Sequence, residues 1–318
     1  MSSAAGASDL HVVLGAGGAV GRTVVDELHS RGRRVRAVNR SGALTVPDGV
    51  EVRRGDITTT DGARAACAGA AVVYHCAAPA YTAWVSEFPR MTDAIRGGAA
   101  AAGAKLVFAD NLFAYGPVSA PMTEDMPSAA SNPKGRVRAA MARSLLAAHE
   151  AGELRVAIGR ASDYYGPRGV GTTVGENVFG AAVRGKVARW VGPLDQPHSF
   201  SYLPDFAKGL VLLGEDARAD GQVWHIPTAE PLTGRRFLDL VFAEVGGPDK
   251  SASVSRTMQR VLGLVNPTVR ALGETWYQHD RPFVVDSTKF TETFGPLPAT
   301  PHAEAIASTV AWFRAANA

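Results

Sequence analysis

The sequence predicts an α/β fold, in which a doubly wound parallel sheet carries a smaller C-terminal lobe. Short apolar strands alternate with helical stretches over the first half of the chain, a pattern typical of parallel sheets. An apolar run at 12–14 breaks into glycines and passes directly into a helix-forming stretch. After about Tyr165, clusters of Gly and Pro interrupt the alternation. We therefore predict a sheet domain over 1–165 and a lobe over 166–318, with one strand and some helices returning to the sheet.

Each element is predicted from its local pattern. Alanine-rich composition favours a helix over 92–103, and Val137, Met141 and Leu145 have helical spacing within 136–150. Further helices are expected at 22–30 and near 302–316, and a basic, mildly amphipathic stretch at 257–271 predicts a lid or lobe helix with solvated charges. The expected strands lie at 11–14, 34–38, 50–53, 71–76, 105–109, 154–159 and 223–226.

Composition excludes several classes of function. The 318 residues are 46% hydrophobic with a net charge of +3, and no long basic run carries the interleaved aromatics of a nucleic-acid-binding protein. No apolar stretch reaches the roughly 18 residues of a membrane span, and the first residues do not resemble a signal peptide. Cys67 and Cys76 lack metal-ligand spacing, so no metal site is predicted. We expect a cytoplasmic monomer or homodimer that acts on a small molecule, without nucleic-acid or membrane partners.

Three glycines at the first turn predict a nucleotide site. Gly15, Gly18 and Gly21 are three residues apart, between an apolar strand and a helix. In a Rossmann-like fold they would serve the tight turn, the close approach of pyrophosphate and the packing of helix on sheet. The phosphates would meet the helix N-terminus, where Ala19 and Val20 lie. The alternative is a flexible turn in a chain that has 34 glycines.

The end of the second predicted strand indicates which dinucleotide is preferred. Asn39, Arg40 and Ser41 provide no carboxylate for a ribose 2′-hydroxyl, whereas Arg40 and Ser41 could hold a 2′-phosphate. The sequence thus predicts NADP(H), with NAD(H) less favoured. The alternative is that Arg40 is a solvated loop charge.

The ordered motifs resemble the extended short-chain dehydrogenase/reductase superfamily, in its branch of NAD-dependent epimerases and dehydratases, over nearly the whole chain. The resemblance implies that Asp56 and Ile57 flank adenine, and that Ala77, Ala78 and Pro79 line the nicotinamide side. The motifs that carry it are the glycine triplet, Gly55-Asp56-Ile57, His75-Cys76-Ala77-Ala78-Pro79, Tyr115-Gly116-Pro117, Tyr165-Gly166-Pro167-Arg168 and Ser201-Tyr202-Leu203-Pro204-Asp205.

The chain also departs from that family's catalytic pattern. Alignment on Pro133 and Gly135 puts Lys134 and Arg138 where the family has the tyrosine and lysine of Tyr-x-x-x-Lys. Neither reproduces proton transfer from a phenol, and the resemblance therefore implies an atypical member. Arg138 could still bind the nicotinamide ribose; alternatively Lys134, Arg136 and Arg138 form a solvated helix face.

Three residues are candidate replacements for the missing proton donor. Asn111 stands at the end of an apolar strand, where the family places a serine or threonine, and Tyr115 and Tyr165 each precede a Gly-Pro pair. The alternatives are a cap or turn role for Asn111 and turn packing for the tyrosines.

Substrate class is predicted from one substitution and from the aromatic residues. Nucleotide-sugar members of the resembled family carry a diphosphate-binding arginine where this chain has His198, and a neutral imidazole is a weaker clamp. Aromatic walls would suit an apolar carbonyl compound, although each Trp could instead be core. His198 and His279 could also act near neutral pH. The predicted substrate residues are Tyr81, Trp84, Tyr164, His198, Trp276 and Tyr277.

These observations support an NADP(H)-dependent reductase of a small to medium apolar carbonyl compound, of the kind found in secondary metabolism, as the leading hypothesis. One alternative is a non-catalytic NADP(H)-binding sensor, and a second is a nucleotide-sugar epimerase or dehydratase. Fold analogy by itself does not choose between them.

Overall fold

The computed structural model describes residues 9–316. Its centre is a seven-stranded sheet with the order β11-β6-β5-β4-β1-β2-β3, and every neighbouring pair is parallel. The predicted α/β, Rossmann-like fold is confirmed. The strand order reverses between β1 and β4, the point at which such sheets bind ligands. The strands are β1 (Leu10–Leu14), β2 (Arg34–Asn39), β3 (Glu51–Arg54), β4 (Val72–His75), β5 (Lys105–Asn111), β6 (Val156–Ala161) and β11 (Gln222–His225).

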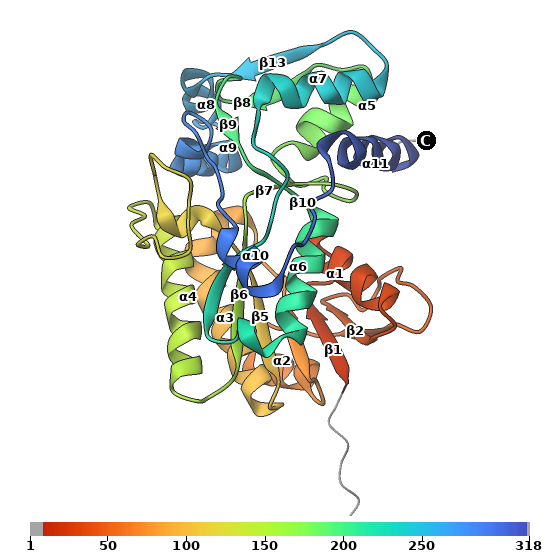
Figure 1. Ribbon diagram of the computed structural model, residues 1–318, viewed down its shortest axis with the longest axis vertical. Helices are drawn as coiled ribbons and strands as arrows, with labels where there is room; N and C mark the ends of the chain where they lie inside the picture. The colour runs from red at the N-terminus through yellow and green to blue at the C-terminus, as the bar shows by residue number, and fades with distance from the viewer. Residues whose placement is uncertain (1–8, 317–318) are drawn as a thin grey trace, which may run out of the picture.

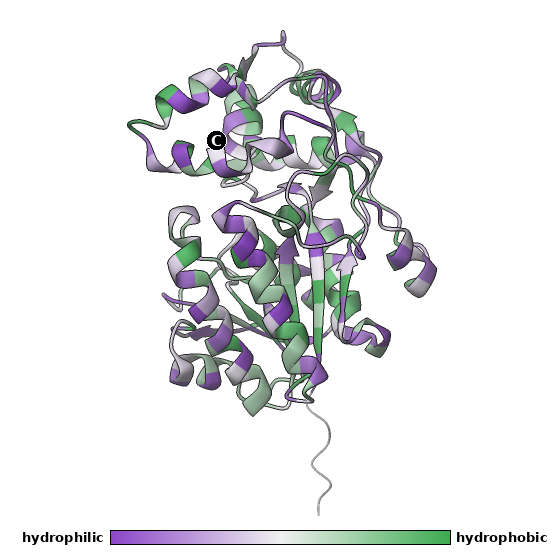
Figure 2. Cartoon of the chain, turned by 90° about the vertical axis from the view of Figure 1, so that its left-hand side faces the viewer, coloured by the Kyte–Doolittle hydropathy of each residue, from purple (hydrophilic) through white to green (hydrophobic). Residues whose placement is uncertain are grey.

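Helices cover both faces of this sheet (Figure 1). Successive β1 side chains face opposite ways, so that Val12 lies in one apolar cluster and Val13 in another. In Figure 2 the central strands are largely green, between helices with purple outer turns. One face is covered by α1 (Ala19–Ser30) and α6 (Leu203–Glu215), the other by α2 (Thr60–Cys67), α3 (Trp84–Ala101) and α4 (Pro133–Glu150).

The second lobe has its own core, at the top of Figure 1. Phe179, Trp190, Phe237 and Phe313 meet there. Its elements are η3 (Gly175–Gly180), α5 (Ala181–Val183), β8 (Ala188–Val191), β12 (Leu232–Thr233), α7 (Gly234–Val245), β13 (Ser251–Val254), α8 (Arg256–Leu262), α9 (Pro267–Leu272), η5 (Gly273–Gln278) and α11 (His302–Ala316).

Short elements join the two parts of the molecule. β11 and α6 belong to the sheet layers although they come late in the chain. The joining elements are η1 (Tyr81–Ala83), η2 (Leu112–Tyr115), β7 (Asp163–Tyr165), β9 (Pro197–His198), β10 (Phe200–Tyr202), η4 (Ala217–Ala219) and α10 (Thr288–Phe294).

The single helix expected over 257–271 is two helices, α8 and α9. Asn266 Oδ1 accepts hydrogen bonds from the backbone N–H groups of Thr268 and Val269, at 2.9 and 3.2 Å. An Asn cap followed by Pro267 begins a new helix and ends the old one. Within residues 9–316, no helix has the length and apolar character needed to cross a bilayer.

Candidate active site

The glycine turn between β1 and α1 is shaped for close packing on one side and for a ligand on the other. Gly15 has a φ of +83°, and a Cβ there would lie 2.6 Å from the backbone of Ala77. A Cβ on Gly21 would overlap the carbonyl oxygen of Gly15. At Gly18, by contrast, a Cβ would make only an ordinary contact of 3.5 Å. Gly18 is the N-cap of α1, and no side chain caps that helix, so its first N–H groups are available to an anion.

A cavity of about 420 Å³ opens beside this turn, at the point where the strand order reverses. Most of the predicted cofactor residues line it or the adjoining hollow: Gly15, Gly18, Asn39, Arg40, Ile57, Ala77, Ala78 and Pro79 in the cavity, and Ala19 in the hollow. Residues that the sequence reasoning missed also line these spaces: Gly17, Thr58, Cys76, Glu87 and Met91 in the cavity and Arg22 and Arg168 in the hollow. A nicotinamide dinucleotide fits this donor set, with its pyrophosphate at Gly18.

Two of the predicted cofactor residues shape the turns around the cavity. Asn39 Oδ1 accepts from the Gly42 N–H at 2.7 Å, and its Nδ2 donates to Ser41 Oγ at 3.0 Å. Asp56 accepts from the backbone N–H and the hydroxyl of Thr58, at 3.0 and 2.6 Å. These hydrogen bonds lower the pKa of the Asp56 carboxyl. Arg40 lies exposed at the cavity wall.

Asp110 holds two arginines inside the fold. Arg138 Nη1 lies 3.2 Å from one carboxylate oxygen of Asp110, and Arg160 Nε lies 3.0 Å from the other. Asp110 is 0% exposed, and the Arg138 guanidinium stacks 4.5 Å from the ring centroids of both Trp84 and Phe88. Arg138 is therefore buried, and the solvated helix face considered for it is wrong.

Lys134 is also buried, at the start of α4. Its Nζ lies 3.0 Å from Glu274 Oε1, an acid of η5, and 4.6 Å from the ring centroid of Tyr81. The Tyr81 hydroxyl lies 3.1 Å from Thr275 Oγ1. A cation, a carboxylate and a phenol thus meet beside Ala80, which lines the cavity. Glu274 had no signal in the sequence, because it lies far along the chain from Lys134. Arg136 is exposed.

The three predicted proton donors are all hydrogen-bonded. Asn111 Oδ1 accepts from the Phe113 N–H at 3.1 Å and caps η2. The Tyr115 hydroxyl lies 2.7 Å from His225 Nε2, and the Tyr165 hydroxyl lies 3.2 Å from His302 Nδ1. Both tyrosines are 1% exposed, so neither hydroxyl faces the cavity. Catalytic roles for these residues stay predictions.

The predicted aromatic wall is largely core. Trp84, Trp276 and Tyr277 are between 5% and 8% exposed; Trp84 packs on Phe88, and Tyr277 contributes to an apolar cluster. Tyr164 is half-buried against Phe206, and burial raises the pKa of its hydroxyl. These positions do not present a broad apolar surface to a substrate.

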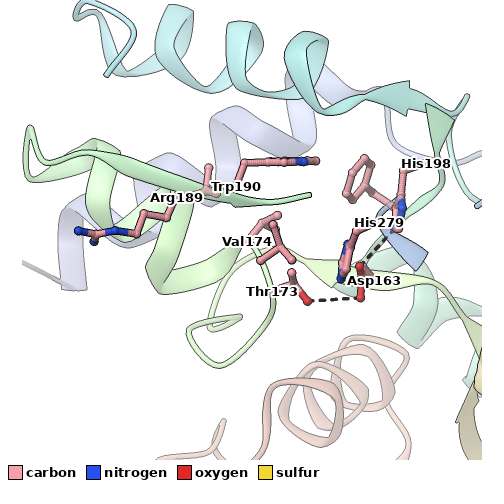
Figure 3. A pocket seen from close by; sticks show the side chains of 10 residues that line it. Asp163, Thr173, Val174, Arg189, Trp190, His198 and His279 are labelled. Carbon is pink, nitrogen blue, oxygen red and sulfur yellow. Dashed lines mark hydrogen bonds and ion pairs between the residues drawn. The ribbon is translucent and has the colours of Figure 1, made fainter. Parts of the chain in front are cut away.

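His198 lies in a small polar pocket with Asp163 and His279 (Figure 3). His198 Nε2 is 3.2 Å from Asp163 Oδ2, and His198 Nδ1 is 3.2 Å from the carbonyl oxygen of Gln278. The rings of His198 and His279 stack, with centroids 6.1 Å apart. Burial lowers the pKa of His279 to about 4. Burial opposes ionisation of Asp163, yet the hydrogen bond and charge of His198 leave its pKa lowered.

Both ring nitrogens of His198 thus lie near protein oxygen atoms, and the ring is buried rather than free in a loop. Asp163 is a site residue that the sequence reasoning did not single out. Its signal was available, because like Asp110 it is an acid at the end of an apolar strand.

Comparison with known families identifies the fold's relatives. The sequence profile of the NAD dependent epimerase/dehydratase family matches residues 11–226. The chain belongs to this family. A dTDP-glucose 4,6-dehydratase of Streptomyces griseus is 26% identical over 191 residues, which are 60% of this chain and 52% of that protein. The chain thus matches about half the length of this curated relative.

Solved structures agree with the fold over nearly the whole chain. The dTDP-glucose 4,6-dehydratase DesIV of Streptomyces venezuelae, with NAD bound, superposes with a TM-score of 0.80 at 19% identity, over 96% of this chain and 97% of that one. MoeE5 in complex with UDP-glucose and NAD gives 0.77 at 22%, over 98% and 100%. The UDP-N-acetylglucosamine 4-epimerase of Bacillus cereus gives 0.77 at 17%, over 96% of each.

These comparisons overturn the leading hypothesis of an apolar carbonyl reductase. The relatives are a dTDP-glucose dehydratase and UDP-sugar proteins. The structure supplies the physical reason for the error, because the aromatic residues assigned to an apolar pocket are mostly core. The nucleotide-sugar alternative is the better supported one, and the neighbours' cofactor is a nicotinamide dinucleotide.

Proposed function

We propose that this chain is a nicotinamide-dinucleotide-dependent enzyme that performs epimerase- or dehydratase-type chemistry on a nucleotide-linked sugar. The observation that carries the proposal is the cavity at the strand-order reversal, which is lined by the glycine turn, Arg40, Ala77, Ala78 and Pro79. The family match and the relatives named above support the same reaction class.

The reaction begins with oxidation of a sugar hydroxyl. A nicotinamide dinucleotide held at the glycine turn and by Arg40, Ala77 and Ala78 would supply the hydride acceptor for this oxidation. A base of this chain would take the hydroxyl proton. We propose that Arg138, buried and held by Asp110, acts on the site through its fixed positive charge rather than by contact. Contact of Arg138 with the nicotinamide ribose stays a prediction.

Lys134 and Glu274 are the pair that we propose for proton transfer. Lys134 Nζ, at the start of α4, lies 3.0 Å from Glu274 Oε1, which belongs to η5. The Glu274 side chain is 34% exposed and that of Lys134 only 4%, and we propose that Lys134 holds Glu274 in place. Asn111, Tyr115 and Tyr165 remain the donors predicted from sequence, and substitution of each tests them against this pair.

We also propose that Arg40 favours the phosphorylated dinucleotide. It lines the cavity after β2, and neither Asn39 nor Ser41 provides a carboxylate for a 2′-hydroxyl. The neighbours named above hold NAD, so both dinucleotides belong in every assay.

The test is a turnover assay of the purified chain with dTDP-glucose, UDP-glucose and UDP-N-acetylglucosamine, each with NAD and NADP. Products are separated by chromatography and identified by mass, where loss of water marks a dehydratase and an unchanged mass with a new retention time marks an epimerase. We expect conversion of at least one substrate, lost in Glu274→Gln. Tight dinucleotide binding without turnover of any nucleotide sugar would overturn the proposal and favour a binding protein.

A further inference from the structure

Exposed apolar side chains gather at one place in the second lobe. Five of the eight large apolar residues that are exposed within residues 9–316 are Met258, Val261, Leu262, Leu264 and Val265. Leu264 is 76% and Val265 83% exposed. We call residues 258–265 the apolar tip; it comprises most of α8 and the turn toward α9, at the upper left of Figure 1. Such clustering marks an interaction site.

Hydrogen bonds from polar side chains fix the backbone of the apolar tip. Arg270 donates from Nε to the Gly263 carbonyl at 2.9 Å and from Nη2 to the Leu264 carbonyl at 3.2 Å. Gln259, 5% exposed, donates to the Val269 carbonyl at 2.7 Å and ties α8 to α9. The backbone of the turn is thus fixed with its apolar side chains outward.

Positive charge lies directly beside the tip. Arg256, Arg260 and Arg270 line an open concavity of about 420 Å³, together with Leu264. The one acid at its wall, Glu274, is paired with Lys134. Residues 251–273 contain no Asp or Glu. The surface therefore combines a protruding apolar turn with the guanidinium group of Arg260. Those of Arg256 and Arg270 lie beside it and also donate to backbone carbonyls, and guanidinium groups bind phosphate well.

We propose that the apolar tip docks this protein on an anionic phospholipid surface, with Leu264 and Val265 below the headgroups and the arginines on lipid phosphates. This combination is the one that holds interfacial segments on membranes. A protein partner fits less well, because stable interfaces take roughly 20–30 residues a side and the tip is one turn. The inference adds a peripheral membrane contact that the sequence reasoning did not expect. It shares the wall residue Glu274 with the reaction proposed above, but its test measures vesicle binding and not turnover.

Cosedimentation with vesicles tests the proposal. The full chain is spun with vesicles of phosphatidylcholine alone and of equal parts phosphatidylcholine and phosphatidylglycerol. We expect binding to the anionic vesicles only, weakened by salt. The double variant Leu264→Ser/Val265→Ser and the single variant Arg260→Glu should each bind roughly tenfold more weakly or worse.

Matched controls separate docking from general effects. Val85 is another exposed valine, and Arg143 another exposed arginine, on the helices of the sheet domain; Val85→Ser and Arg143→Glu should bind vesicles like the parent. Circular dichroism and dinucleotide affinity should be unchanged in every variant. Absence of vesicle binding, or equal binding by the tip variants, would overturn the proposal. So would binding of glycerol phosphate without vesicles, or tip-dependent self-association without lipid.

Discussion

Gly18 differs from Gly15 and Gly21 because packing inside the protein does not require a glycine at its position. Packing inside the protein requires Gly15 and Gly21, whereas a side chain at Gly18 would have room. Because packing does not require glycine at position 18 and no side chain caps α1, we propose that an anion approaches the turn at this residue.

The variant Gly18→Asp uses this difference. Aspartate is a favourable N-cap, so the fold should be kept, but its carboxylate would occupy the place of the pyrophosphate and repel it. We expect dinucleotide affinity to fall by about a hundredfold or more, as measured by calorimetry. Gly97→Asp places the same charge on the exposed side of α3 and should leave affinity unchanged. Equal affinity of both variants would refute the placement of the pyrophosphate.

Arg40 allows a second prediction for a single residue. In Arg40→Ala, the affinity for NADP should fall by roughly tenfold while that for NAD changes little, because only the 2′-phosphate loses a charged hydrogen bond. Fluorescence titration with both dinucleotides measures the ratio, and Arg143→Ala on α4 is the matched control. An unchanged ratio would make Arg40 a solvated loop charge.

At the scale of elements, Asp110 joins β5, β6 and α4 through two buried arginines. Asp110→Asn would leave both guanidinium groups without their carboxylate. We expect the free energy of unfolding to fall by about 3–5 kcal/mol, as measured by urea denaturation. Asp9 makes a comparable pair with Arg34, but both side chains are more than 65% exposed. Asp9→Asn should therefore cost about 1 kcal/mol or less, and equal losses would contradict this reading of the cluster.

The contact between α4 and η5 gives a prediction about catalysis. Glu274→Gln preserves shape and a hydrogen bond to Lys134 but removes the carboxylate. If this pair transfers the proton, kcat should fall by about 10²–10⁴-fold with KM little changed, and the pH profile of kcat should change. Glu150→Gln, an exposed acid at the end of α4, provides the comparison. A kcat equal to that of the parent would exclude Glu274 and return attention to Asn111.

Across the whole molecule, local patterns predicted the elements well. Each sheet strand lies within two residues of its expected bounds, because the short apolar runs that form buried parallel strands are a local property of the sequence. Gly15, Gly18 and Arg40 were brought together for the same reason, since one βαβ unit contains them all.

Features formed by distant segments were not predictable in this way. Asp110 meets Arg138 and Arg160 across 28 and 50 residues of chain, and only the packing of α4 and β6 makes these contacts. The substrate hypothesis failed likewise, because exposure of Trp276 and Tyr277 cannot be read from residue type. Within 257–271, periodicity continued through the turn, and the Asn266 cap decided the break.

Buried histidines set the acid limit of stability for the molecule. Burial lowers the pKa of His75 to about 3 and those of His225 and His279 to about 4. Histidine in an unfolded chain has a pKa of about 6.5. Below that pH these three rings therefore bind protons in the unfolded chain but stay neutral in the folded one. Stability should therefore be level above about pH 6.5 and fall toward pH 4, by up to about 1.4 kcal/mol per pH unit for each histidine.

Urea denaturation over this pH range measures the slope. In His225→Gln the slope of the unfolding free energy against pH should be shallower by the contribution of one histidine, because Gln does not bind a proton. This holds even if the variant is less stable at every pH. His29→Ala removes a histidine that is exposed at the end of α1 and should leave the slope as it is. A level profile down to about pH 4.5 would mean that these rings gain protons in the folded state as readily as in the unfolded one. In that case water must reach the His75, His225 and His279 pockets, and the packing around β4 and β11 must be looser than described.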